Sequence, residues 1–364
     1  MTGVIVHEWL APIGGSEQVV EALADIFPDA PVYCLWDDAP GRFASGRVHE
    51  TWLARTPLRR SKVAAMPLMP ATWRHLPAED ADWVLASSHL FAHHARFAGA
   101  ARSAPKYCYV HTPARYIWVP ELDGRGNGGA QRAASAVLKR LDRRRAQEAV
   151  AIAANSAFVR DRIAMAWGRD SVVIHPPVDV EFFASSDSGL TDDEHRLLAE
   201  LPESFLLGAS RLVPYKRVDV AIAAGHASDL PVVVVGRGPD ESRLRAIAES
   251  GRTPVHFLGR TSRPMMRELF RRTAAFVFTA VEDFGIIPVE AMAAGAPVIA
   301  SRVGGVGESV VDGRTGVLLE RFDAPDLRAA VDAASRLDRG NVRARAQDFS
   351  AERFAREISS WLPS

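Results

Sequence analysis

The sequence predicts an α/β protein built from two parallel sheets in succession. Its 364 residues suffice for two domains with separate cores, since domains usually hold about 100–200 residues. Apolar runs of strand length alternate with helix-length segments along the chain. Within these runs the apolar residues are continuous rather than alternating, as in parallel strands that helices cover on both faces. The runs are GVIVHEW, PVYCLW, DWVLASS, KYCYVH, VAIAANS and SVVIHPP in the first half, and SFLLGAS, PVVVVGRG, PVHFLGR, AAFVFTA, PVIAS and TGVLLE in the second.

A stretch rich in Pro, Ser and Asp separates the two sets of strands. It reads HPPVDVEFFASSDSGLTDDEHRLLAELPES, and its composition predicts a hinge and linker. We therefore expect a first domain over residues 1–177 and a second over residues 178–345. In open parallel sheets, ligands bind beyond the carboxyl ends of the strands. A nucleotide or sugar site is thus expected in a cleft between the two domains.

The composition argues against several classes of protein. Lys and Arg together number 44, as do Asp and Glu, so no net field attracts nucleic acid. No apolar run approaches the ~18 residues of a membrane span, and the start lacks the pattern of a secretory signal. We therefore expect a cytoplasmic protein. Cys34 and Cys108 lie in strand-like runs, where buried free thiols are expected.

The stretch EDFGIIPVEAMAAGAPVIAS carries the strongest chemical signal. It leaves the expected strand AAFVFTA, and its Pro288 and Gly295 predict the start and end of a helix. Gly285 allows close approach to a ligand, and the N–H groups of Gly285, Ile286 and Ile287 are placed to hold an anion such as a phosphate. Glu282 and Glu290 flank this anion site. Carboxylates accept hydrogen bonds from hydroxyl groups, so the pattern predicts a ligand that joins phosphate to ribose or another sugar.

A second stretch, GASRLVPYKRVDVAIAA, supports the same interpretation. The strand SFLLGAS is expected to end at Arg211, and Lys216 follows in the loop before a helix that begins near Val218. Two cations at the carboxyl end of a strand are suited to neutralising a diphosphate leaving group.

These stretches together resemble the retaining GT-B glycosyltransferases, specifically the large bacterial mannosyl- and glucosyltransferase family that is similar to glycosyltransferase family 4. The resemblance rests on ASRLVPYKRVD, VVVVGRGPDESRL, VHFLGR and EDFGIIPVEAMAAGAPVIAS, and in the first half on IGGSEQVVEAL, YVHTPARYIW and ANSAFVRDRI. It implies two Rossmann-like domains whose parallel sheets face a central cleft. The N-terminal domain would bind the acceptor and the C-terminal domain the nucleotide sugar, and residues 346–364 would return to the first domain as a helix.

The resemblance also implies roles for individual residues. Glu290 would bind the ribose hydroxyls and Glu282 the donor sugar, and Arg211 and Lys216 would clamp the diphosphate. His111, after the strand KYCYV, would lie near the transferred sugar. The remaining contacts would come from glycines below the phosphates and from backbone groups around the sugar and the base: Gly14, Gly15, Arg260, Phe284, Gly285, Ile286 and Ile287.

The implied reaction transfers a sugar from a nucleoside diphosphate to an acceptor hydroxyl with retention at the anomeric carbon. The departing phosphate would help to accept the acceptor's proton, so catalysis would rest on stabilising the leaving group and positioning the acceptor. We expect neither a metal nor a further cofactor. The Asp-x-Asp sequence of Asp80 to Asp82 precedes its strand, at the wrong edge of the sheet for a metal–diphosphate site.

The donor and acceptor are less sharply indicated. HTPARYIW with an early GGSEQ resembles mannosyltransferases of bacterial surface-polysaccharide assembly, which favours GDP-mannose and leaves UDP-sugars open. The acceptor would be a glycan or a lipid-linked sugar. The segment Thr51–Leu76 mixes Trp and Met with basic residues, as an interfacial segment would, and a second basic run is VLKRLDRRRAQEAV. These runs predict a peripheral membrane contact, with solvated helix faces as the alternative.

Three other functions compete with glycosyl transfer. A sugar-nucleotide epimerase uses the same two-domain fold, and a non-catalytic sugar-binding protein is the second competitor. The third is a nicotinamide-dependent oxidoreductase, because GRGNGG at Gly124–Gly129 satisfies the dinucleotide pattern; no strand precedes it, which favours a loop.

Overall fold

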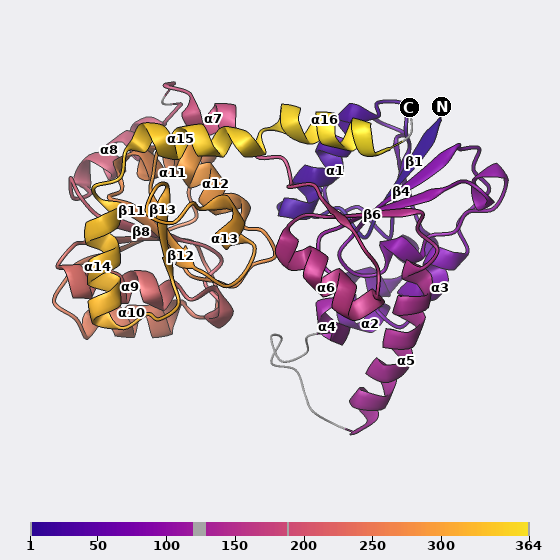
Figure 1. The fold of residues 1–364 in the computed structure, drawn as a ribbon, viewed down its shortest axis with the longest axis horizontal. Coiled ribbons are helices and arrows are strands. Elements are labelled where there is room, and N and C mark those ends of the chain that lie inside the picture. The colour runs from indigo at the N-terminus through magenta and orange to yellow at the C-terminus, as the bar shows by residue number, and fades with distance from the viewer. Residues whose placement is uncertain (1, 119–128, 188, 363–364) are drawn as a thin grey trace. The chain divides into compact units, whose positions relative to one another are not determined.

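The computed structural model describes residues 2–118, 129–187 and 189–362, and the chain divides into two compact units (Figure 1). The first unit combines Met1–Pro177 with the C-terminal Glu352–Ser364, and the second is Val178–Ala351. Each unit has its own parallel sheet and its own apolar clusters on the two faces of that sheet. Among the described residues, no helix combines the length and the apolarity that crossing a membrane requires.

The sheet of the first unit has seven strands in the order β3-β2-β1-β4-β5-β6-β7, all paired in parallel. The order reverses direction between β1 and β4, which makes this pair the switch point of the sheet. In the register of this pair, His7 lies opposite Ser87. The strands are β1 (Gly3–His7), β2 (Val32–Cys34), β3 (Val48–Glu50), β4 (Trp83–Ser88), β5 (Lys106–Val110), β6 (Ala151–Ala154) and β7 (Val172–Val173).

The sheet of the second unit has six strands in the order β10-β9-β8-β11-β12-β13, again all parallel. Here the order reverses between β8 and β11. The four residues of β9 are all Val and all buried, as expected for a central strand covered on both faces. The strands are β8 (Leu206–Ala209), β9 (Val232–Val235), β10 (Val255–Gly259), β11 (Ala275–Phe278), β12 (Val298–Ser301) and β13 (Gly316–Leu319).

Helices cover both faces of each sheet. In the first unit they are α1 (Gly15–Ile26), α2 (Lys62–Ala65), α3 (Met69–Arg74), α4 (Arg115–Trp118), α5 (Gly129–Ala146), α6 (Ala157–Trp167) and α16 (Ala351–Trp361), with 3₁₀ turns η1 (Trp52–Arg55), η2 (Pro57–Arg60), η3 (Ala92–His94) and η4 (Ala100–Arg102). In the second unit they are α7 (Val180–Ala184), α8 (Asp192–Glu200), α9 (Val218–Ser228), α10 (Glu241–Glu249), α11 (Arg263–Arg272), α12 (Ile286–Ala293), α13 (Val306–Ser309), α14 (Ala324–Ala334) and α15 (Arg339–Ala346), with η6 (Pro214–Lys216) and η7 (Gln347–Phe349).

The stretch expected to be a linker contains two helices, α7 with five residues and α8 with nine. α7 begins where the side chain of Asp179 accepts a hydrogen bond from the N–H of Phe182, and a capping box formed by Thr191 and Glu194 starts α8. Phe183 and Leu201 then pack into the core of the second unit. The linker prediction is therefore wrong for these two helices, because Asp179 and Thr191, part of the polar composition that suggested a loop, cap them.

The C-terminal helix α16, the yellow helix that ends near the C-terminus in Figure 1, packs on the first unit. Phe354 and Ile358 enter an apolar cluster together with Val19 and Leu23 of α1. The preceding Phe349 lies in the core of the second unit. The segment that returns to the first unit therefore starts at Glu352 rather than at the predicted residue 346.

The two cysteines are buried free thiols, as the sequence predicts. Burial raises the pKa of Cys108 to about 11, so this thiol stays protonated and behaves as a small apolar side chain.

Candidate functional site

The switch point of the second sheet brings together residues that the sequence assigned to separate roles. Lys216 lies in the loop after β8 and Glu282 in the loop after β11, and these two strands are neighbours. Lys216 Nζ is 2.5 Å from Glu282 Oε1, and the two side chains are only 16% and 17% exposed. The cation and the carboxylate therefore form a partly buried ion pair at the carboxyl edge of the sheet.

The loop after β11 leads into the N-terminus of α12. The helix begins at Ile286, two residues before the Pro288 start predicted from the sequence, so that prediction is wrong. Pro is tolerated in the whole first turn because the first N–H groups of a helix have no helical acceptor. Gly285 precedes the helix with φ 91°, a backbone region that favours glycine, and a Cβ there would lie 2.7 Å from Val306 Cγ2. Phe284, immediately before it, is buried.

A glycine pair that the sequence analysis missed supports this loop from behind. The N–H of Gly305 donates to the carbonyl of Glu282 at 2.8 Å. A Cβ on Gly305 would lie 2.0 Å from the carbonyl oxygen of Asp283, so the two backbones can approach this closely only at glycine. The sequence did contain a signal for this contact: a pair of glycines, Gly304 and Gly305, is separated from the strand PVIAS by two residues.

Glu290 projects from the second turn of α12 and is half-buried. Burial raises its pKa to about 7; Arg263 opposes this shift and Asp179 adds to it. No ion pair of Glu290 occurs in the part of the chain that the structure describes. A carboxyl group that titrates near neutral pH beside a helix N-terminus is available to bind a ligand.

Two further predicted residues of this unit, Arg211 and Arg260, are more exposed. Arg211 follows β8, and its guanidinium donates to the hydroxyl of Tyr215 at 2.8 Å. It therefore shares the switch-point edge with Lys216 without joining the Lys216–Glu282 pair. Arg260 is exposed and follows β10, the outermost strand of the sheet, which lies two strands away from β8.

In the first unit, His111 follows β5 and is buried. Its Nε2 lies 2.8 Å from the hydroxyl of Ser87 on the neighbouring strand β4. Burial and the nearby imidazoles hold the pKa of His111 well below its ordinary value, so this imidazole is neutral at physiological pH. Gly14 is the cap of α1 and Gly15 its first residue, which places both glycines in the loop region after β1.

Two further histidines, missed in the sequence, surround His111. The ring of His7 lies 6.2 Å from that of His111, His89 lies 6.2 Å from His111, and His7 lies 5.6 Å from His89. His7 ends β1 and His89 follows β4, so the group occupies the switch point of the first sheet and the next strand. The pattern that pointed to His111, a histidine at the carboxyl end of an expected strand, also occurs at His7 in GVIVHEW and directly after DWVLASS at His89.

A buried carboxylate stands behind these imidazoles. Glu8 is fully buried, and its Oε1 accepts hydrogen bonds from the N–H of Leu90 at 2.7 Å and of Ala92 at 2.9 Å. Its Oε2 lies 3.3 Å from His89 Nδ1. Burial opposes ionisation of Glu8, yet the adjacent imidazoles and the backbone donors lower its pKa to about 2. Glu8 is therefore a carboxylate at any ordinary pH.

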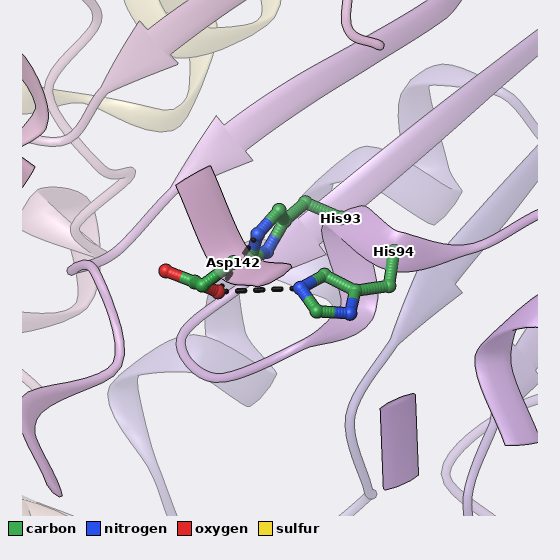
Figure 2. A group of neighbouring side chains, drawn as sticks. All are labelled: His93, His94 and Asp142. Atoms are coloured by element: carbon green, nitrogen blue, oxygen red, sulfur yellow. Dashed lines mark hydrogen bonds and ion pairs between the residues drawn. The ribbon is translucent and has the colours of Figure 1, made fainter. Parts of the chain in front are cut away.

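Deeper in the first unit, His93, His94 and Asp142 form a buried cluster, in which both imidazoles point toward one carboxylate (Figure 2). Asp142 Oδ1 is 3.1 Å from His93 Nε2 and 3.2 Å from His94 Nε2. Its Oδ2 accepts the indole N–H groups of Trp118 and Trp167, each at 2.7 Å. Hydrogen bonds from His94, Trp118 and Trp167 thus tie η3, α4 and α6 to Asp142 of α5, and His93 Nε2 adds a contact at ion-pair distance without an aligned hydrogen bond.

The segment Thr51–Leu76 is only in part the interfacial surface that its composition suggested. Met69 and Trp73 are buried in the core, and Arg59 donates to Asp38 at 2.8 Å. Lys62 Nζ lies 3.9 Å over the ring of Trp9. The side chains that are exposed on this segment include Trp52, Arg55, Arg60, Lys62, Val63 and Leu68.

Two other sequence features have simple outcomes. Asp82 accepts a hydrogen bond from the N–H of Thr2 at 2.7 Å before β4 begins, consistent with its interpretation as a loop residue. The GRGNGG sequence lies outside the described residues except for Gly129, which begins α5.

Two family models match the chain. Residues 13–182 match the model of Glycosyltransferase Family 4, and residues 192–353 match that of Glycosyl transferases group 1. The chain is 31% identical over 194 residues to the GDP-mannose-dependent α-(1-6)-phosphatidylinositol monomannoside mannosyltransferase of Mycolicibacterium smegmatis, covering 48% of this chain and 50% of that protein. It is 33% identical over 201 residues to the D-inositol 3-phosphate glycosyltransferase of Mycobacterium tuberculosis, covering 51% and 41%. The chain thus spans half the length, or less, of these curated relatives.

Solved structures share the fold over nearly the whole chain. HepE from Anabaena, in its complex with UDP-glucose, superposes with a TM-score of 0.73 at 21% identity and 99% coverage of both chains. WaaG, a glycosyltransferase involved in lipopolysaccharide biosynthesis, gives a TM-score of 0.64 at 16% identity, covering 98% of this chain and 99% of its own. At these identities the likeness concerns the fold.

Proposed function

Because this chain belongs to the retaining glycosyltransferases of family 4 with the GT-B fold, we propose that it transfers a hexose, with mannose from GDP-mannose as the favoured donor, to a glycan or lipid-linked acceptor. The second unit would bind the nucleotide sugar and the first unit the acceptor. The observation that carries this assignment is the grouping of Lys216, Glu282, the N-terminus of α12 and Glu290 at one switch point.

The donor's diphosphate would bind at the N–H groups of the α12 N-terminus. A helix N-terminus favours anions, and Gly285 supplies the positive φ with which the loop enters the helix. Arg211 and Lys216 would neutralise the charge that develops as the diphosphate leaves. When Lys216 turns toward the phosphates, it releases Glu282, whose carboxylate is then available to accept hydroxyls of the donor sugar.

Glu290 would accept the two ribose hydroxyls, for which it must be ionised. Backbone groups of Phe284 to Ile287 would contact the sugar and the phosphates, and the backbone of Arg260 would contact the base. In the first unit, Gly14 and Gly15 would lie below the phosphates.

His111 would contact the transferred sugar. Because burial keeps this imidazole neutral, it can accept or donate a single hydrogen bond without placing a cation next to the developing oxocarbenium charge. The leaving phosphate would take the acceptor's proton on the same face of the sugar, which gives retention.

Two kinds of relative bear on the donor. The mycolicibacterial relative is named for its use of GDP-mannose, and the HepE structure contains UDP-glucose. A thermal-shift panel of GDP, UDP and ADP, with GDP-mannose and UDP-glucose, separates these possibilities, because a ligand at 100 times its Kd stabilises the native state by about 2.7 kcal/mol. We expect the guanine nucleotides to give the largest shift. A larger shift with the uridine nucleotides would contradict GDP-mannose as the donor and would favour a UDP-sugar.

Incubation with a labelled sugar nucleotide then identifies the reaction. Label that moves to an acceptor supports glycosyl transfer, whereas a donor that changes only its stereochemistry indicates an epimerase, and an unchanged donor indicates a binding protein. Repeating the reaction with EDTA tests the proposed independence from metals, and loss of activity that Mg²⁺ or Mn²⁺ restores would contradict it.

The proposed location is the cytoplasmic face of a membrane, with the exposed side chains of Thr51–Leu76 in peripheral contact. Trp52, Val63 and Leu68 supply apolar surface, and Arg60 and Lys62 supply charge for anionic headgroups.

A further inference from the structure

The switch point of the first sheet holds a carboxylate–imidazole pair that the function described above does not use. We infer that His89, oriented by the buried carboxylate of Glu8, binds and orients the acceptor hydroxyl in the transfer reaction. This inference rests on the proposed function, because it takes the first unit as the acceptor-binding unit.

The first argument is the state of Glu8. One of its oxygens, Oε1, is held by the N–H groups of Leu90 and Ala92 and by the hydroxyl of Ser88 at 3.2 Å. The other, Oε2, lies 3.3 Å from His89 Nδ1, within ion-pair distance, and neither of these two atoms forms an aligned hydrogen bond with a described residue. A fully buried carboxylate is costly unless it has partners, so the His89 contact is the only use the described fold makes of Oε2.

The second argument is the tautomer that this contact selects. The negative charge of Oε2 lies 3.3 Å from Nδ1, and a carboxylate can only accept, so this contact favours the tautomer of His89 that carries its proton on Nδ1. The other nitrogen, Nε2, is then an acceptor. In the part of the chain that the structure describes, Nε2 of His89 has no hydrogen-bond partner, and its side chain remains 21% exposed. A hydroxyl donor therefore fits the atom that the fold leaves open.

The third argument is position. In open parallel sheets ligands bind where the strand order reverses, and Glu8 and His89 follow β1 and β4, the two strands at that reversal. The edge of the Trp9 ring packs against His89 with 4.8 Å between centroids, and His7 lies on another side at 5.6 Å. These contacts fix the plane of the His89 ring next to His111, the residue assigned to the transferred sugar.

The roles of the two residues differ. His89 would touch the acceptor, whereas Glu8 would act only through His89 and is a positioning residue. Glu8→Gln keeps the shape of the side chain and one acceptor oxygen for the loop N–H groups, but places an NH₂ group where Nδ1–H needs an acceptor. The expected consequence is the opposite tautomer of His89, with a donor facing the acceptor hydroxyl.

The test measures transfer from GDP-mannose and UDP-glucose to p-nitrophenyl α-D-mannoside, and in parallel hydrolysis, in which water is the acceptor. The variants are His89→Ala, Glu8→Gln and the double variant. His75→Ala is the control, because His75 is exposed and its one hydrogen bond among the described residues is to the carbonyl of Ala71. We expect both single variants to lower turnover by about tenfold or more while the donor Kd stays within twofold. The double variant should be no worse than His89→Ala alone, because Glu8 acts through His89.

Several outcomes would overturn the inference. They are unchanged turnover in His89→Ala, a donor Kd that weakens in parallel with turnover, and additive losses in the double variant, which would make Glu8 merely structural. A wild type that binds neither nucleotide sugar would instead reject the proposed function, and this inference with it. Melting temperatures of all variants, with and without nucleotide, show whether a loss of turnover reflects unfolding.

Discussion

The two sheets of this protein reverse their strand order at equivalent places, yet they put different chemistry there. At the reversal in the second unit, between β8 and β11, the side chains form a charged pair, Lys216–Glu282, that remains partly accessible. At the reversal in the first unit, between β1 and β4, the groups are imidazoles backed by the fully buried Glu8. In the second unit α12 begins after Gly285, which has a φ of 91°, whereas in the first unit α1 begins after Gly14, whose φ of 177° is extended.

Under the proposed function, this difference indicates how one architecture would divide a reaction between a phosphate site and an acceptor site. Phosphates bring full charges, so their site needs cations and open N–H groups that can exchange water for ligand. An acceptor hydroxyl brings only a dipole, and a neutral imidazole in a buried setting recognises it without the cost of a second charge. Four experiments can break or sharpen this comparison.

The largest effect is expected from Lys216→Ala. Removing a preorganised charge at the leaving group should slow transfer by about 10²–10³-fold, or about 2.7–4 kcal/mol. The turnover rate at a saturating donor concentration measures this loss. The neighbouring Arg217→Ala is the control, since Arg217 packs over the ring of Phe322. Turnover that survives within a few-fold would mean that Lys216 only neutralises Glu282.

Asp142→Asn should cost about 2–3 kcal/mol of the free energy of unfolding. The amide that replaces one oxygen turns an acceptor into a donor, so at least one of the surrounding indole or imidazole N–H groups stays buried and unpaired. Urea unfolding of Asp142→Asn and of the exposed Asp161→Asn gives the comparison. A chelator should leave the wild-type midpoint unchanged, and a chelator-induced loss of stability would show instead that the cluster binds a metal.

Nucleotide affinity should rise about tenfold between pH 6 and pH 8. Burial raises the pKa of Glu290 to about 7, so the unliganded carboxyl is mostly protonated at pH 6 and must lose its proton to accept two ribose hydroxyls. The same raised pKa favours the folded state at low pH, so its contribution to stability is lost as the pH rises through 7. Calorimetry over this range measures the affinity. Glu290→Gln should bind weakly at every pH and abolish the slope, and a wild-type affinity that ignores pH would contradict the role of Glu290.

The smallest effect is expected at the membrane. Arg60→Ser should weaken binding to vesicles of phosphatidylglycerol and phosphatidylcholine by about 1 kcal/mol, most clearly at low salt. Arg59→Ser is the matched control, because Arg59 is already paired with Asp38. Co-sedimentation measures both, and absence of wild-type binding at low salt would remove the membrane contact while leaving the family assignment intact.

The sequence by itself determined the architecture and most of the loop between β11 and α12. Continuous apolar strands identify parallel sheets because both faces of each strand are buried. EDFGIIPVE identifies a helix start to within two residues, because proline restricts φ and glycine permits a positive φ. These are short-range properties, and they led to Glu282, Gly285 and Glu290 directly. They failed where local composition was ambiguous, as for the caps at Asp179 and Thr191, which suggested a linker and instead begin helices.

Only the tertiary structure decided which distant residues meet. Lys216 and Glu282 are 66 residues apart and pair because β8 and β11 are neighbours, whereas Glu8 and His89 pair across the reversal between β1 and β4. Strand order is set by how helices pack over the whole sheet, so no local pattern encodes it. For the same reason, the sequence could place a histidine at the end of a strand, but only the fold shows that Glu8 lies behind His89 and leaves one of its nitrogens open.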